Sequence, residues 1–135
     1  MRITSKGRYA LILLLYLAEH NDGSYIALKD IAEEENISNK YLEQIIPLLT
    51  KASLVKSNRG AGGGYILSKD ASACTLLDIL SVTEQNLFAK EDDDRPAIKA
   101  LADGMTSSLE EYLSSLTLQD LLDKKRESYE FSYCI

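Results

Sequence analysis

The chain has little of the chemistry that builds metal, redox and catalytic sites, with two cysteines and one histidine in 135 residues. Cys74 and Cys134 show neither a metal-type spacing nor a disulfide framework, which favours a reducing, cytoplasmic compartment and predicts no metal and no cofactor. His20 falls at the end of a helical pattern, where the helix dipole explains it without catalysis. No nucleophile with a neighbouring base stands out, so the sequence does not indicate an enzyme.

Long apolar runs are also missing. The apolar run Leu11–Ala18 is far too short to cross a membrane and lacks the features of a signal peptide. With 45% hydrophobic and 27% charged residues, the composition is that of an ordinary globular chain, and 135 residues suffice for a buried core. We therefore expect one domain with an appended dimerisation segment and no membrane association.

An excess of positive charge is absent as well, because the formal net charge is −6. Residues 1–70 hold 9 Lys/Arg and 8 Asp/Glu, a net of +1, whereas residues 71–135 hold 6 and 13, a net of −7. The first half is therefore able to meet phosphates locally, and the second half is repelled by them. An acidic half is also common in proteins that never meet DNA.

What the chain does contain is a helix-turn-helix pattern followed by a hairpin, over Leu28–Leu67. Apolar residues spaced as in a helix predict a first helix over 28–34. Ser38 is a suitable N-cap for a second helix over 39–52. Pro47 is expected to kink that second helix, leaving residues 48–52 as a bent continuation or a separate turn.

The exposed face of the second helix carries residue types that read bases. The expected contacts are Ser38, Asn39, Lys40, Tyr41, Glu43 and Gln44. Asn and Gln pair with adenine, Glu accepts from the cytosine amino group, and Lys reaches guanine or phosphate. An ordinary solvated helix face shows the same mixture, so the position within the helix-turn-helix decides in favour of DNA.

Two short strand patterns, 54–57 and 65–68, enclose a loop that holds four of the seven glycines. The loop resembles the wing of a winged helix, with Arg59 as a minor-groove or phosphate contact. A nucleotide-binding loop is rejected because such loops open a helix and end in Gly-Lys-Ser/Thr, whereas a strand beginning at Tyr65 follows here. A bare hairpin turn remains the alternative.

The chain begins with a helical pattern over 3–20 that Thr4 or Ser5 can cap. Three cations, Arg2, Lys6 and Arg8, lie near its first turn. Because cations are unfavourable beside the positive end of a helix dipole, a DNA phosphate at this place is one explanation. Plain solvation of surface charges is the other.

In the second half, Thr75 and Asp78 form a capping-box pattern for a helix ending near residue 85. An acidic run, Glu91–Asp94, precedes a long helix that begins at Pro96. Apolar residues recur along it at an average of 3.6 positions and predict a dimerisation seam: Ile98, Leu101, Met105, Leu109, Tyr112 and Leu116. A short helix over 117–124 and an aromatic tail over 127–135 are expected to follow, the tail docking on the protein.

Five motifs in order resemble the Rrf-two family of bacterial winged-helix regulators: MRITSKGRYAL, DIAEEENIS, YLEQI, LVKSNRGAGGGYIL and TLLDIL. The resemblance covers about the first 85 residues. It implies a homodimeric repressor, with a helix in the major groove and a wing on the minor groove of a pseudo-palindromic operator. It also assigns the DNA contacts to Ser38, Lys40, Tyr41, Glu43, Gln44, Arg59 and Gly60.

Cluster-binding members of that family carry three cysteines before the long helix, and residues 88–105 contain none. Because a thiolate-ligated cluster needs those ligands, we expect no iron–sulfur cluster. The chain then resembles a cluster-lacking type that answers to a partner protein, a small-molecule effector or a thiol signal. Cys74, before a helix N-terminus, is a possible thiol sensor, or else a small buried residue.

The expected fold is therefore mainly α, a winged helix-turn-helix with a two-stranded wing and a long C-terminal dimerisation helix. Residues 1–85 form the DNA-binding domain, and residues 86–135 form the acidic loop, dimerisation helix and C-terminal helix and tail. The expected function is sequence-specific DNA binding in transcription regulation. A winged-helix interaction module that no longer binds DNA is the alternative, which the acidic runs 33–35 and 91–94 keep open.

Overall fold

The computed structural model describes residues 2–60 and 62–134, with side chains described through residue 129. Helix α1, Ser5–Glu19, is central, as its nearly continuous apolar surface predicts. Ala10, Leu13, Leu14 and Leu17 are each no more than 1% exposed. The Thr4 hydroxyl caps the helix by accepting a hydrogen bond from the backbone N–H of Gly7 at 3.1 Å.

The helix-turn-helix prediction is confirmed by α2, Leu28–Glu35, and α3, Asn39–Lys51. Asn36 ends α2 in the left-handed conformation, at φ 55°, which asparagine tolerates better than most residues. Pro47 lies inside α3, yet the helix runs on as one element to Lys51. Of the two alternatives predicted for residues 48–52, the structure therefore shows a continuation of the helix and not a separate turn. Pro47 is exposed, so solvent is close to the part of the helix where its missing N–H leaves a carbonyl free.

The wing consists of strands β1, Val55–Asn58, and β2, Gly64–Leu67, paired antiparallel with Asn58 opposite Gly64. The sequence did not predict that Ile26 forms an isolated antiparallel bridge with Tyr65 of β2. Its N–H and carbonyl exchange hydrogen bonds with Tyr65 at 2.9 and 2.8 Å. A Cβ at position 64 would lie 2.4 Å from the carbonyl of Ile26, so only glycine permits this approach.

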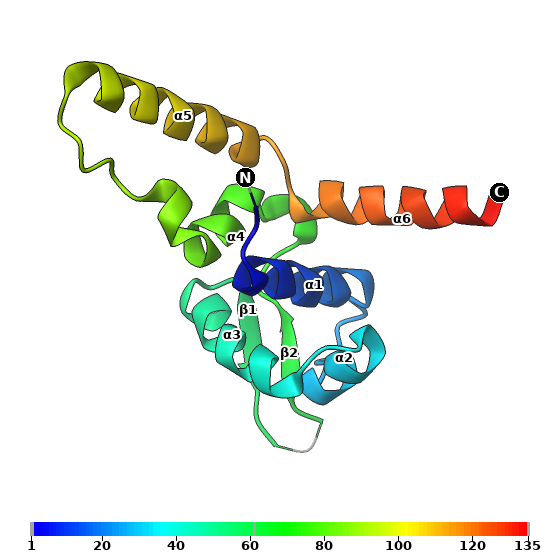
Figure 1. Ribbon diagram of the computed structural model, residues 1–135. Helices are drawn as coiled ribbons and strands as arrows, with labels where there is room; N and C mark the ends of the chain where they lie inside the picture. Colours follow the sequence, from blue (N-terminus) through cyan, green and yellow to red (C-terminus); the bar gives the residue numbers. More distant parts are fainter. Residues whose placement is uncertain (1, 61, 135) are drawn as a thin grey trace.

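The remaining elements bring the C-terminal half against α1 (Figure 1). They are η1, Ala71–Ala73; α4, Leu76–Thr83; η2, Gln85–Phe88; α5, Pro96–Ser114; and α6, Leu118–Cys134. The predicted capping box of Thr75 and Asp78 is confirmed, as is Pro96 at the start of α5. The capping box fixes the first turn of α4, the helix on which α5 packs.

The prediction of a short last helix and a separate tail is wrong, because α6 continues to Cys134. Tyr129 on this extension is 57% exposed and does not dock on the protein. The side chains of Phe131, Tyr133 and Cys134 lie outside the described residues. No helix in the described part of the chain is long and apolar enough to cross a membrane.

One core joins the two halves of the chain, since buried residues of α1, α3, α4 and the starts of β1 and α6 form a single cluster. The turn before α6 is fastened to the start of α4. The N–H of Leu76 donates to the carbonyl of Leu116 at 2.9 Å, and the N–H of Leu118 donates to the carbonyl of Cys74 at 2.8 Å. The end of α5 is thereby held beside the start of α4.

Candidate nucleic-acid interface

The predicted reading face of α3 is open to solvent. Ser38, Asn39, Lys40, Glu43 and Gln44 are exposed, while the opposite stripe, including Leu42 and Ile45, lies in the core. The Ser38 hydroxyl accepts a hydrogen bond from the N–H of Tyr41 at 3.2 Å, which fixes the first turn of the helix. A helix that is anchored by its apolar stripe presents its polar face in a defined orientation.

Two of the predicted base contacts are coupled to each other. The side-chain amide of Asn39 donates a hydrogen bond to Oε1 of Glu43 at 3.2 Å. The two residues are four positions apart and share one face of the helix. Asn39 therefore restrains the Glu43 carboxylate, and the second oxygen of that carboxylate remains available to accept from a base.

Tyr41, which the sequence places on the flank of this face, is half-buried. Its ring meets the ring of Tyr9 from α1 edge to face, with centroids 4.8 Å apart. Such aromatic pairs contribute about 0.5–1.5 kcal/mol beyond the area they bury. This contact sets the first half of α1 beside the start of the reading helix.

The wing extends beyond α2 and α3, on the side away from α5 (Figure 1). Arg59 is exposed at the end of β1. Gly60 follows with φ 97° and accepts a hydrogen bond from the N–H of Gly63 at 2.9 Å. The loop is therefore a closed turn with a cation at its base, rather than an open chain. The structure thus sets the two predicted groups of contacts, on α3 and on the wing, toward one end of the molecule.

Arg2, Lys6 and Arg8 are exposed near the start of α1, and their contact with a DNA phosphate stays a prediction. The structure shows an anion of the protein itself at this helix end. The N–H and hydroxyl of Thr4 donate to the carboxylate of Glu84, at 2.6 and 2.7 Å. Glu84 is 2% exposed, and Gly7 lies so close that a Cβ there would be 2.7 Å from Oε1. The anion at this helix end is therefore the protein's own carboxylate. Sequence reasoning missed Glu84, although a lone glycine in an apolar helix signals a close approach.

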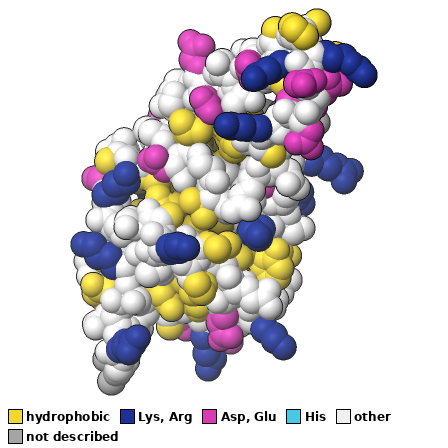
Figure 2. All heavy atoms as spheres, turned by 90° about the vertical axis from the view of Figure 1, so that its left-hand side faces the viewer, with side chains coloured by type: hydrophobic (Ala, Val, Ile, Leu, Met, Phe, Trp, Pro, Cys, Tyr) yellow, Lys and Arg dark blue, Asp and Glu magenta, His cyan; other side chains and the backbone are white. Residues whose placement is uncertain are grey.

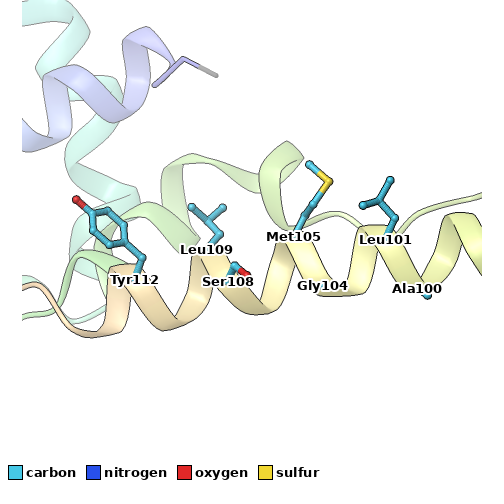
Figure 3. A pocket seen from close by; sticks show the side chains of 7 residues that line it. All are labelled: Ala100, Leu101, Gly104, Met105, Ser108, Leu109 and Tyr112. Atoms are coloured by element: carbon cyan, nitrogen blue, oxygen red, sulfur yellow. The ribbon is translucent and has the colours of Figure 1, made fainter.

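The residues of the predicted dimerisation seam fall into an exposed group and a partly buried group. Ile98, Leu101, Met105 and Tyr112 are 41–64% exposed, and Figure 3 shows Leu101, Met105 and Tyr112 projecting from the same side of α5. Leu109 and Leu116 instead pack partly against the protein's own core. Leu116 lies beyond the last residue of α5, and the neighbouring Leu113 is buried, because the end of this helix is seated on α4.

An apolar hollow of about 670 Å³ follows the exposed part of the seam, and every residue that lines it comes from α5: Ala100, Leu101, Gly104, Met105, Ser108, Leu109 and Tyr112. A Cβ added at Gly104 would meet no other atom within 4 Å. Figure 2 shows a further group of apolar side chains in the middle of one face of the molecule, below the level at which α5 lies in Figure 1, with charged groups around it. A hollow with one wall is a surface that a second molecule can complete.

The geometry of Cys74 favours the buried alternative over the thiol sensor. The side chain is 3% exposed, and burial raises the pKa of its thiol above the ordinary value. The reactive thiolate is therefore disfavoured at neutral pH. Helix α4 begins two residues later, at Leu76, and the carboxylate of Asp78 in its first turn also raises the pKa of the thiol.

The acidic run before α5 forms local turns. The N–H of Asp93 donates to Glu91 at 3.1 Å, the N–H of Arg95 donates to Asp93 at 3.0 Å, and the Arg95 guanidinium pairs with Asp93 at 3.3 Å. Among the described residues, no three His, Cys, Asp or Glu side chains are grouped closely enough to hold a metal ion. The donors at the position of the family's cluster ligands are carboxylates rather than thiolates, and they do not fit an iron–sulfur cluster.

Comparison with known proteins finds similarity along nearly the whole chain. Residues 3–124 match the Rrf2 family, which is described as iron-dependent transcriptional regulators. The HTH-type transcriptional regulator CymR of Bacillus subtilis (strain 168) is 40% identical over 136 residues, which cover 97% of this chain and 99% of CymR. The regulator IscR of Photorhabdus laumondii is 36% identical over 133 residues, 93% of this chain and 81% of IscR.

Solved structures agree with the fold. The structure of CymR, the global cysteine regulator of B. subtilis, superimposes with a TM-score of 0.78 at 39% identity. The match covers 92% of this chain and 98% of that one. The winged helix and the helices that follow it are thus shared along the length of both chains.

Proposed function

The chain belongs to the Rrf2 family of transcriptional regulators, and from this premise we propose that it is a homodimeric repressor of a pseudo-palindromic operator, active without an iron–sulfur cluster. One observation carries the proposal. The reading helix and wing lie toward one end of the molecule, and the unpaired apolar side of α5 lies toward the other (Figure 1). Two copies paired through α5 leave both wings free to meet DNA, with two half-sites related by the same two-fold axis.

In the proposed complex, α3 enters the major groove. Lys40 and Gln44 contact base edges or phosphates, and Glu43 accepts from a cytosine amino group. The hydrogen bond from Asn39 to Glu43 supports a joint role, in which Asn39 orients the carboxylate. Ser38 and Tyr41 contact the backbone beside the groove. Residues 1–85 act as the DNA-binding domain and residues 86–135 as the dimerisation segment.

Arg59 and Gly60 approach the minor groove in this proposal. A guanidinium suits a narrow minor groove because the potential there is strongly negative. The turn of Gly60, at φ 97°, brings the backbone close to the phosphates. As a DNA-binding regulator, the protein acts in the cytoplasm, where bacterial DNA lies.

A gel shift with fragments selected by the protein from random DNA tests the proposal. Arg59→Ala is expected to weaken binding to all sequences and to lower the salt slope by about 1, whereas Glu43→Ala is expected to relax base preference. Lys124→Ala, which removes an exposed cation from α6, is the matched control and should bind normally. If no fragment is bound in a salt-sensitive manner while one protein partner is retained, the interaction-module alternative replaces this proposal.

A separate experiment tests the proposal that the protein is active without an iron–sulfur cluster. The sequence holds two cysteines, and Cys74 is buried. Anaerobic incubation with iron and sulfide should therefore give no cluster absorption, and an iron chelator should leave DNA binding unchanged. The likeness to B. subtilis CymR, a global cysteine regulator, supports a signal from sulfur metabolism. We propose that it arrives through a protein partner or a small molecule rather than through Cys74.

A further inference from the structure

Two polar contacts fasten the ends of α1 to helices from the other half of the chain. At its start, Thr4 donates twice to Glu84, across 80 positions of sequence. At its end, the Lys125 ammonium donates to Glu19 at 2.7 Å, across 106 positions. We call these contacts the two α1 ties. The first tie joins α1 to the end of α4, within residues 1–85, and the second joins α1 to α6. For this inference we call α1–α3 with the wing the DNA-binding unit, and α4–α6 the C-terminal unit.

The first tie lies at a junction in the backbone. The N–H of Glu84 donates to the carbonyl of Leu80, which closes α4, and its own carbonyl accepts from Leu87 at the start of the connector toward α5. Its side chain is directed to the start of α1. Glu84 thus lies at the end of α4, in the C-terminal unit, and its side chain contacts the DNA-binding unit.

Burying a carboxylate costs free energy unless hydrogen-bond donors surround it. Here the donors are the N–H and hydroxyl of Thr4, at the positive end of the α1 dipole, and hydrogen bonds to charged groups are stronger than those between neutral groups. Gly7 leaves the space that the carboxylate fills. The contact is therefore specific in position, and a looser arrangement would leave a charged group without partners.

The second tie is half-sheltered, with 26% of the Lys125 side chain and 29% of the Glu19 side chain exposed. The hydrogen bond from Lys125 is the main cause that lowers the pKa of Glu19. Partial shelter makes this pair stronger than a fully exposed surface ion pair. The start of α6 is in turn held against α4 by Leu118, so the tie connects α1 to a fixed element.

We propose that the two α1 ties, Glu84–Thr4 and Glu19–Lys125, set the orientation of the DNA-binding unit relative to α5 and thereby select the spacing between operator half-sites. The inference rests on the proposed function, because half-site spacing has meaning only for a dimer on DNA. One added base pair moves a half-site by about 3.4 Å and turns it by about 34°. Because the two units also share one apolar core, loss of a tie loosens their relative orientation without separating them. A dimer loosened in this way follows part of the change in spacing, which a fixed dimer cannot follow.

The test uses duplexes with two copies of the half-site selected by the wild-type protein, at spacings that differ by single base pairs, and one duplex with a single half-site. The wild type is expected to bind its best spacing at least tenfold more tightly than a spacing one base pair longer. Glu84→Gln and Glu19→Gln should each reduce that ratio to about threefold, with affinity for the single half-site unchanged.

Glu34→Gln is the matched control. Glu34 accepts a hydrogen bond from the Tyr16 hydroxyl at 2.5 Å, a contact within the DNA-binding unit, so the same substitution there should keep the tenfold ratio. Thr4→Ser, which retains the hydroxyl, should also keep it. If the two α1 ties contribute only to stability, their loss should lower the melting temperature and weaken binding equally at all spacings.

The proposal is overturned if Glu84→Gln and Glu19→Gln remain folded dimers with the wild-type spacing ratio. If Glu84→Gln does not fold, Glu19→Gln decides alone, because its partly exposed pair is not required by the core. A wild-type protein that binds no DNA, or that remains monomeric on it, instead refutes the proposed function. The two failures are therefore distinct.

Discussion

Replacing Met105 by Glu should separate the proposed dimer into monomers. Met105 lies in the middle of the exposed seam of α5, and 61% of it is exposed. Burying a whole side chain of this kind contributes about 1.5–3 kcal/mol, so burying the exposed three-fifths contributes about 1–2 kcal/mol. A two-fold axis places the residue in the interface twice, which makes about 2–4 kcal/mol per dimer.

Loss of that contribution alone raises the dissociation constant of the dimer by about 30- to 1,000-fold. Two buried carboxylates add a further cost, because a charge taken out of water without a partner is strongly unfavourable. Sedimentation at micromolar concentration should therefore show a dimer for the wild type and a monomer for Met105→Glu. The far-ultraviolet circular dichroism should be unchanged, since the side chain has little contact with its own core.

Ser107→Glu is the control for this experiment. Ser107 is also exposed on α5, and two positions along a helix place it on the opposite side from Met105. The same acid there should leave the dimer intact. If Met105→Glu sediments as a dimer, or if Ser107→Glu dissociates just as readily, the assignment of this side of α5 to the interface is refuted.

Three further predictions concern Cys74, Tyr16 and Gly64. Cys74 should react with a thiol reagent far more slowly in the folded protein than in denaturant at neutral pH, because burial raises the pKa of the thiol; rapid labelling would restore it as a sensor. The hydrogen bond to Glu34 raises the pKa of Tyr16 to about 12, above an unfolded value near 10, so stability is fully present below pH 10 and is lost as pH rises toward 12. Alkaline unfolding of Glu34→Gln against wild type measures this loss. Gly64→Ala should destabilise the wing by about 1–3 kcal/mol, because its Cβ would lie 2.4 Å from Ile26, and urea unfolding measures this.

Local signals in the sequence were enough to predict the elements that carry the reading surface. The Ser38 cap, the Thr75 capping box and the Pro96 start each act within four residues of chain. Periodicity then separated the buried stripe of α3 from its polar face. These features depend on neighbours along the chain, and a sequence displays such neighbours directly.

Contacts between distant segments were not predictable in this way. Glu84 and Lys125 read as ordinary surface charges, because nothing near them in sequence reveals Thr4 or Glu19 as partners. The full length of α6 was missed for a different reason, since its apolar periodicity fades after Leu122. No Gly or Pro occurs after that residue, and the absence of a helix breaker was the signal that could have extended the helix.

The net charge of −6 agrees with DNA binding once the position of the charges is considered. The acidic run 91–94 and the acids of α5 lie toward the end of the molecule opposite the wing (Figure 1). At physiological ionic strength, charges are largely screened beyond about 8 Å, so the proposed contact depends on Lys40, Arg59 and their immediate neighbours. At longer range the acidic end is repelled by phosphates while the wing end is not. The charge asymmetry therefore favours approach with the wing toward DNA, and orientation during encounter raises the association rate.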